Sequence, residues 1–262
     1  MTAPPIVSER TRTQILVIAV IAAAWTAAAI TQLSGSARLV HHHTLIEGTL
    51  PLPVALILFV AAWQLMIAAM MLPSTLPLLQ HFRRAASAHP NPGRAEAALI
   101  AGYFTVWTVF GAAALLGDGM LHRAVDANPW LAERPWLVAG TLLVVAGAAQ
   151  FMPLTQACLQ TCRHPVGYLM QKYRPGTRAA YELGVHHGMF CLGCCWALML
   201  VMFAAGVAGL VWMAALAAVM VYEKVGRHGS LLAVVAGLAL LMWGTLVLAH
   251  PGWLPQPLAG MS

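Results

Sequence analysis

Sulfur-containing side chains are concentrated in one part of the sequence. Cys191, Cys194 and Cys195 fall within five residues of an otherwise apolar run, and Cys158 and Cys162 are spaced four residues apart a little earlier. Thiolates and thioethers are soft ligands that select Cu(I), zinc or an iron–sulfur cluster over hard cations. A single cysteine in an apolar helix usually packs as a small hydrophobic residue. Five cysteines grouped between residues 158 and 195 instead favour a metal-binding site.

Helical spacing places the second cysteine group on one face together with a histidine. Residues three and four apart share a face of an α-helix, so His187, Cys191 and Cys194 form one stripe, with Cys195 on its flank. Glycines at positions 184 and 188 would let a neighbouring backbone approach closely. We therefore expect this face to lie in the interior of a helix bundle, where imidazole and thiol groups meet.

A second sulfur-bearing stripe is expected in the apolar segment 54–79. Trp63, Met66, Met70 and Pro73 share a face by the same spacing. Pro73 lacks an N–H donor and its ring clashes with the carbonyl four residues earlier, so a kink is expected near it. A kink can leave a carbonyl group free to bind something. Most methionines in a membrane protein only pack, and Met70 is predicted as an auxiliary ligand because of its expected depth.

Two further groups of polar residues are weaker candidates. Glu223 ends an apolar run on the same face as Met220, where a carboxylate could be a ligand, a proton acceptor or the partner of an imidazole. It could equally be a solvated helix end. The run of three histidines at 41–43 could capture a transition metal loosely in an outer loop, although surface solvation explains it as well.

The elements that must position these side chains are transmembrane helices. Of the 262 residues, 60% are hydrophobic and only 8% are charged, which is typical of a polytopic membrane protein. Because a spanning helix needs about 20 apolar residues, we predict an all-α bundle of about seven helices that forms a single integral membrane domain over residues 1–262. The expected spans are 14–33, 54–79, 97–117, 136–159, 184–205, 207–223 and 230–249.

The basic residues predict the orientation. Cytoplasmic loops collect Lys and Arg, and a cytoplasmic N-terminus puts most of the 14 basic residues on that side, namely Arg10, Arg12, Arg83, Arg84, Arg94, Arg163, Lys172, Arg174, Arg178, Lys224 and Arg227. The formal net charge of +6 then reflects topology and contact with anionic lipids of the bilayer. No basic cluster is interleaved with aromatic residues, so nucleic acid is not an expected partner.

Other chemistries find little support in the sequence. It has no Ser-His-Asp arrangement, no glycine-rich phosphate loop after a strand, and no paired carboxylates within a span. Proton-coupled transporters usually carry intramembrane acids, whereas the acidic residues here fall at span ends or in loops. These absences favour a binding protein over an enzyme, and they leave a thiol redox enzyme as an alternative.

Three blocks of the chain carry a resemblance to a known family. The blocks are Met70-Met71-Leu72-Pro73, the segment AQFMPLTQACLQTCRHP over 149–165, and the segment 188–199 followed by Trp212-Met213 and Glu223-Lys224. With them the chain resembles a bacterial family of predicted metal-binding integral membrane proteins, a domain of unknown function. The resemblance implies metal binding and a copper-handling or copper-chaperone role. One position departs from the family pattern, since Thr155-Gln156 stands where a Lys is expected after Pro-Leu.

The sequence therefore predicts a soft-metal site in the cytoplasmic half of a bundle in a bacterial inner membrane. Its ligands for Cu(I) or zinc are expected to be Cys158, Cys162, Cys191, Cys194 and Cys195, with His187, Met70 and Glu223 assisting. The function would be to hold copper and exchange it with a donor or acceptor protein. A membrane thiol–disulfide redox protein and a haem protein using His186 or His187 remain alternatives, which thiol trapping and an absorbance spectrum would distinguish.

Overall fold

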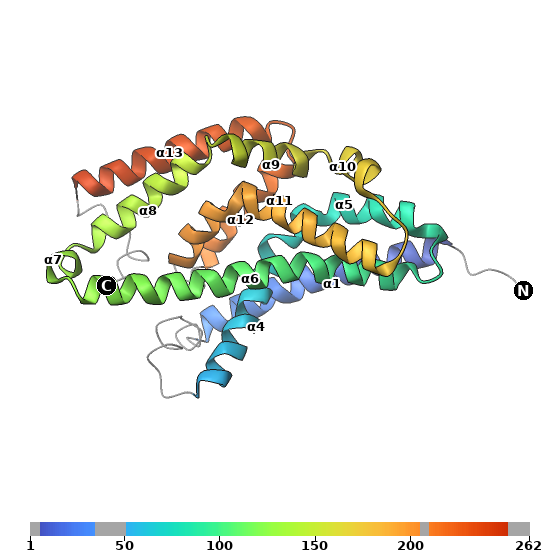
Figure 1. Cartoon of the computed structure of the whole chain (residues 1–262), viewed down its shortest axis with the longest axis horizontal. Helices are drawn as coiled ribbons and strands as arrows, with labels where there is room; N and C mark the ends of the chain where they lie inside the picture. Colours follow the sequence, from blue (N-terminus) through green and yellow to red (C-terminus); the bar gives the residue numbers. More distant parts are fainter. Residues whose placement is uncertain (1–5, 35–50, 205–209, 251–262) are drawn as a thin grey trace, which may run out of the picture.

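The structure is a computed structural model that describes residues 6–34, 51–204 and 210–250. These residues form α-helices joined by short connections, with one short 3₁₀ turn and no strand, so the predicted all-α class is confirmed for them (Figure 1). The elements are α1 (Ile6–Leu33), α4 (Leu52–Met70), α5 (Leu72–Ala85), η1 (Ala86–Ala88), α6 (Pro92–Asp126), α7 (Pro129–Ala132), α8 (Pro135–Ala149), α9 (Pro153–Arg163), α10 (Pro165–Lys172), α11 (Thr177–Ala204), α12 (Leu210–Val225) and α13 (Gly229–Ala249). The histidine run at 41–43 lies outside the described residues.

Several helices are long and apolar enough to cross a membrane. Within the described ranges these are Gln14–Leu33 of α1, the whole of α6, Thr177–Met202 of α11, and α13. Two bent pairs, α4 with α5 and α8 with α9, raise the number from four to six if each pair is one span. The sixth predicted span, 207–223, overlaps α12, which has 16 residues and is not among these candidates. The count of seven and the cytoplasmic N-terminus stay predictions.

Prolines determine where most of these helices begin. Proline stands in the first two positions of α4, α5, α6, α7, α8, α9 and α10. Its fixed φ suits the first helical turn, where its missing N–H leaves no hydrogen bond unmade. Within a long apolar run the same residue breaks the helix. The sequence thus divides two of the predicted spans into two helices each.

The kink predicted near Pro73 is confirmed. The helices α4 and α5 meet at Met71 with a bend of 68°. The Ala69 carbonyl, which proline prevents from bonding within the helix, accepts a hydrogen bond of 3.1 Å from Trp25 Nε1 of α1. A second bend of 61° separates α8 from α9 before Pro153. There the side-chain amide of Gln156 donates to the Gln150 carbonyl at 2.5 Å.

Helix α11 lies within the bundle against α6, α8, α9 and α12. Its contact with α6 is close because glycine lacks a side chain: a Cβ added to Gly184 would overlap the Leu99 carbonyl, and one added to Gly188 would lie 3.0 Å from Val106. This confirms the close approach predicted from the two glycines. In the most apolar 18-residue segment of α11, 56% of the residues are buried, in contrast to 11% in that of α1. The sulfur-bearing helix is therefore central.

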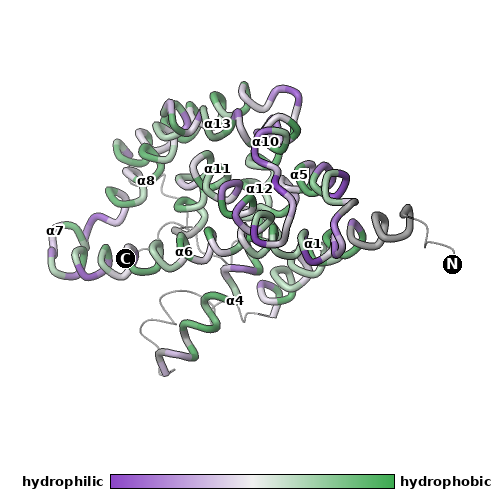
Figure 2. Tube along the Cα trace, turned by 45° about the vertical axis from the view of Figure 1, so that its right-hand side comes forward, coloured by the Kyte–Doolittle hydropathy of each residue, from purple (hydrophilic) through white to green (hydrophobic). Residues whose placement is uncertain are grey.

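The outer surface is suited to lipid. Large apolar side chains are exposed on several helices, for example Ile57 at 68%, Leu116 at 70% and Leu231 at 61%. Figure 2 shows hydrophobic residues along the length of the helices, while hydrophilic residues gather near α7 and in the connections around α5 and α10. A lipid environment accounts for such exposure, because apolar side chains lose nothing by facing hydrocarbon.

Candidate metal centre

The three cysteines of α11 face the interior of the bundle, as predicted. Cys191, Cys194 and Cys195 are 1%, 3% and 2% exposed. The thiols of Cys194 and Cys195 donate hydrogen bonds to the Cys191 carbonyl, at 3.1 Å and 2.8 Å. Such bonds to a carbonyl one turn earlier are typical of small polar side chains within a helix. They hold the sulfur atoms close to the backbone, on one side of α11.

A methionine thioether at the α4–α5 bend contacts one of these cysteines. Met71 is fully buried, and its Sδ lies 3.8 Å from the Cys195 Sγ. Met70, the predicted auxiliary ligand, is also fully buried and belongs to the same core cluster as the cysteines. Met71 lies at the helix break, where the face derived from an unbroken helix does not continue through a bend of 68°.

Lys224 of α12 projects into the same cluster and is only 5% exposed. Its Nζ lies 3.0 Å from the Cys191 Sγ, 3.7 Å from the Cys195 Sγ and 3.8 Å from the Met71 Sδ. The sequence interpretation placed this lysine at the cytoplasmic edge. The available signal was its spacing of four from Met220, a fully buried residue on the same helical face. We refer to Cys191, Cys195, Met71 and Lys224 as the sulfur–lysine cluster.

Aromatic side chains cover one side of this cluster. The Tyr103 hydroxyl of α6 lies 3.1 Å from the Cys191 Sγ. The Tyr103 ring stacks on His187 with centroids 5.7 Å apart, and Tyr168 of α10 approaches the same imidazole at 6.0 Å. Burial, with a smaller contribution from Cys162, raises the pKa of Tyr168 above its ordinary value, so the phenol stays neutral. His187 is therefore a buried side chain between two tyrosines, one turn before Cys191.

The two cysteines of α9 have different surroundings. Cys162 is 8% exposed, and its thiol lies near enough to that of Cys194 for the two to interact electrostatically. Cys158 packs against Gly193, where a Cβ would lie 2.6 Å from its sulfur. Cys158 also lines an apolar pocket with Leu154, Met189 and Trp196. The structure thus brings four cysteines together and leaves Cys158 on the outer side of that group.

Glu223 is almost completely buried, at 1% exposure. Its Oε1 accepts a hydrogen bond of 3.4 Å from Gln150 Nε2, at the α8–α9 bend. Its backbone carbonyl accepts a hydrogen bond from the Arg163 guanidinium. The Gln150 Oε1 has no hydrogen-bond partner among the described residues. Glu223 is thus a fixed, buried side chain that ties α12 to both halves of the bent pair.

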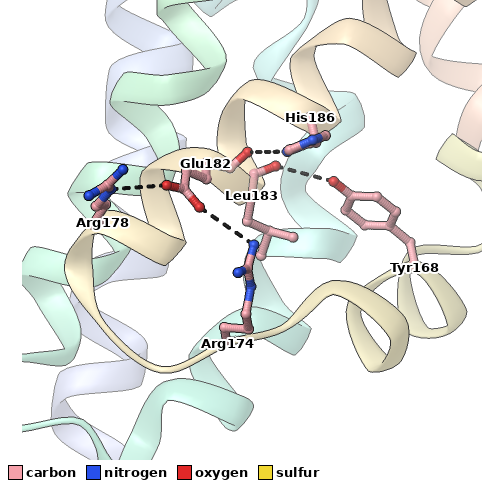
Figure 3. Close-up of polar contacts among 6 residues, drawn as sticks. All are labelled: Tyr168, Arg174, Arg178, Glu182, Leu183 and His186. Atoms are coloured by element: carbon pink, nitrogen blue, oxygen red, sulfur yellow. Dashed lines mark hydrogen bonds and ion pairs between the residues drawn. The ribbon is translucent and has the colours of Figure 1, made fainter.

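The amino-terminal turns of α11 carry a separate polar network, drawn in Figure 3. The Glu182 carboxylate forms ion pairs with Arg174 at 3.5 Å and with Arg178 at 3.1 Å. The His186 ring nitrogen meets the Glu182 carbonyl at 2.8 Å, and the Tyr168 hydroxyl donates to the Leu183 carbonyl at 3.2 Å. His186 is exposed, so the two adjacent histidines lie in different environments. This network fastens α10 to the start of α11.

Within the described ranges, no three His, Cys, Asp or Glu side chains form a ready-made metal site. Two cysteine thiols are bonded to a carbonyl, and the ammonium of Lys224 stands among the sulfur atoms. All five cysteines are free and buried. An ion entering this cluster would require thiol rotation, which is a change of side-chain torsion rather than of fold.

The fold and these residues together define a helical, multi-pass membrane protein with a buried, sulfur-rich centre. A protein-family model described as PpoB2, copper chaperone, matches residues 60–247. The chain therefore belongs to this copper chaperone family, which agrees with the copper connection implied by the sequence resemblance. No curated protein and no solved structure gives a significant match. The matched range includes every residue of the sulfur–lysine cluster.

Proposed function

We propose that the protein binds Cu(I) in its sulfur-rich centre and passes the ion to another protein in or at the membrane. Copper is the cargo in this proposal. Its first ligands are the thiolates of Cys191 and Cys195 with the Met71 thioether, because soft sulfur ligands suit Cu(I). The observation that carries the proposal is the contact between Cys195 and Met71, since it joins two helices far apart in sequence through sulfur alone.

The remaining predicted residues extend this proposal. Cys194 and Cys162 are buried neighbours whose thiols interact electrostatically, and they could receive an ion from the first ligands. Cys158 would be the outermost thiol of such a series. His187, Met70 and Glu223 would act by shaping and closing the site rather than by direct ligation. Zinc, which the ligand chemistry alone allows, is not part of the proposal, because membership of a copper chaperone family favours copper.

The direct test is the metal content of the detergent-purified protein. The wild-type protein is loaded with Cu(I) under reducing conditions and desalted. It should retain about one ion per chain in competition with a chelator. The double variant Cys191→Ser, Cys195→Ser should retain none, because both thiolate ligands are lost. The copper content of Cys158→Ser reports whether the site extends to α9. Equal copper in the wild type and the double variant would refute the proposal.

A thiol–disulfide redox role is a second candidate, favoured by one observation. The thiols of Cys162 and Cys194 come from two helices and interact electrostatically, and a reversible disulfide would need such a neighbouring pair. Thiol trapping in living cells separates the two functions. A redox protein would show a disulfide-bonded fraction that the Cys162→Ser variant lacks, whereas a Cu(I) site keeps its thiols reduced.

A further inference from the structure

The unusual member of the sulfur–lysine cluster is the lysine itself. Ionised side chains in a protein interior are normally paired with an opposite charge, because an isolated charge costs much to bury. Among the described residues, the hydrogen-bond partners of the Lys224 ammonium are two thiols and one thioether, and no carboxylate forms an ion pair with it. A positive charge is therefore built into the site proposed for a positive ion.

The distances keep that charge close to any bound ion. Thiolate–metal bonds are about 2.3 Å long, and the Lys224 Nζ lies 3.0 Å from the Cys191 Sγ. An ion bonded to Cys191 is then within about 5 Å of the ammonium, unless the lysine side chain moves away. The Lys224 Nζ is also 3.7 Å from the Cys195 Sγ and 3.8 Å from the Met71 Sδ. An ion bonded to either of these sulfur atoms is therefore near the ammonium as well.

Repulsion between the ammonium and the ion depends on the charge of the ion. By Coulomb's law a divalent ion at the same position is repelled twice as strongly as a monovalent one. The other charged groups of the site are the same for both ions, so the difference due to Lys224 does not depend on them. Sulfur ligands alone discriminate poorly here, because thiolates bind both Cu(I) and Zn(II) well.

We infer that Lys224 is a specificity-determining residue that makes this sulfur site prefer monovalent Cu(I) over divalent Zn(II). The inference rests on the proposed function and names its selectivity. Unit charges this close together in a partly buried site interact strongly enough to change a binding constant by more than about tenfold. Allowing for movement of the lysine side chain, removal of the charge should still shift the relative affinities at least roughly tenfold toward Zn(II).

The experiment measures the affinities of purified protein for Cu(I) and Zn(II) separately, by competition with chelators of known affinity. Lys224→Leu removes the charge without adding a ligand, and Lys224→Arg retains it. The other lysine of the chain, exposed Lys172, provides the matched control Lys172→Leu. Lys224→Leu should move the ratio of the two affinities at least about tenfold toward Zn(II), while Lys224→Arg and Lys172→Leu leave it unchanged.

The ratio separates selectivity from a structural role. If Lys224 only supported the fold, its replacement would weaken both ions alike, and the unchanged ratio would overturn the inference while leaving the copper proposal standing. If Lys224→Leu does not fold, Lys224→Gln removes the same charge with a polar side chain. A wild-type chain that binds no Cu(I) would refute the proposed function, and the selectivity inference with it.

Discussion

At the scale of single residues, Met71 is the most informative position. Its thioether is buried at the helix bend and contacts both Cys195 and Lys224. Leucine has nearly the same volume and is tolerated in cores at little cost, so Met71→Leu should preserve the fold while removing a soft ligand. We expect Cu(I) affinity to fall by at least about tenfold, the lower end for changes around metal ligands.

Chelator competition measures this change, and α11 supplies the control. Met189 is on the same helix as the cysteines but is 57% exposed on the outer surface. Met189→Leu therefore removes a thioether without touching the cluster and should leave Cu(I) affinity unchanged. Equal affinity in Met71→Leu and Met189→Leu would show that Met71 only packs.

The residue types of the site were predictable from the sequence, but their partners were not. The spacing of His187, Cys191 and Cys194 was enough to place them on one buried face, because that face is a property of a single unbroken helix. Met71 and Lys224 belong to other helices, and their contacts depend on how those helices pack. Lysine also signals a membrane edge in most sequences, which concealed its position among the sulfur atoms.

At the scale of helices, the close packing of α11 on α6 fixes the depth of the cysteines. Gly184 allows this approach, because an added Cβ would overlap the Leu99 carbonyl. A backbone atom cannot move aside as a flexible side chain can, so Gly184→Ala should push the two helices apart. Overpacking of this kind typically costs about 1–3 kcal/mol. The thermal midpoint in detergent should fall by several degrees.

The matched control for this change lies on α6. Gly117 is also within a helix, and an added Cβ there would meet no atom within 4 Å. Because alanine is a better helix former than glycine by up to about 1 kcal/mol, Gly117→Ala should leave stability unchanged or raise it slightly. If both variants unfold at the same temperature, the contact between α6 and α11 is not as close as described.

Helix boundaries show the same division between local and tertiary information. Apolar runs and prolines located the helices, and Pro73 correctly predicted the first bend. The second bend, before Pro153, was not predicted, because the run 136–159 reads as one continuous apolar segment. The Gln150 carbonyl at this bend accepts a hydrogen bond from the side chain of Gln156. At this break Gln150 is buried, whereas Phe151 and Met152, which follow it, are exposed.

At the scale of the whole molecule, three basic connections meet at one end. Arg163, at the end of α9, donates to the Arg227 carbonyl in the α12–α13 turn at 3.4 Å. Tyr173, after α10, donates to the Ala85 carbonyl at the end of α5 at 3.0 Å. The connections that carry the predicted cytoplasmic arginines are thus neighbours in space, which is what the positive-inside rule requires of them.

This arrangement bears on the path of α11 and α12. The chain leaves the basic end through α11 and is back at it after α12, which predicts an even number of crossings for the two helices together. With 16 residues at 1.5 Å each, α12 is about 24 Å long, somewhat short of a hydrocarbon core of about 30 Å. A local thinning of the bilayer or a tilted neighbour can accommodate such a short span at modest cost.

We therefore predict that the carboxyl terminus lies on the face opposite the basic connections, since α13 starts from the basic end and crosses once. Fusing a fluorescent protein that matures only in the cytoplasm to the carboxyl terminus should give dark cells. An alkaline phosphatase fusion, active only outside the cytoplasm, should be active at the same position. Fusions after Arg227, in the α12–α13 turn, should give fluorescent cells and inactive alkaline phosphatase, because that turn belongs to the basic end. Fluorescence at both positions would show that α13 does not cross the membrane. The proposed depth of the sulfur–lysine cluster would then be wrong, because α12 would not be followed by a membrane-spanning helix.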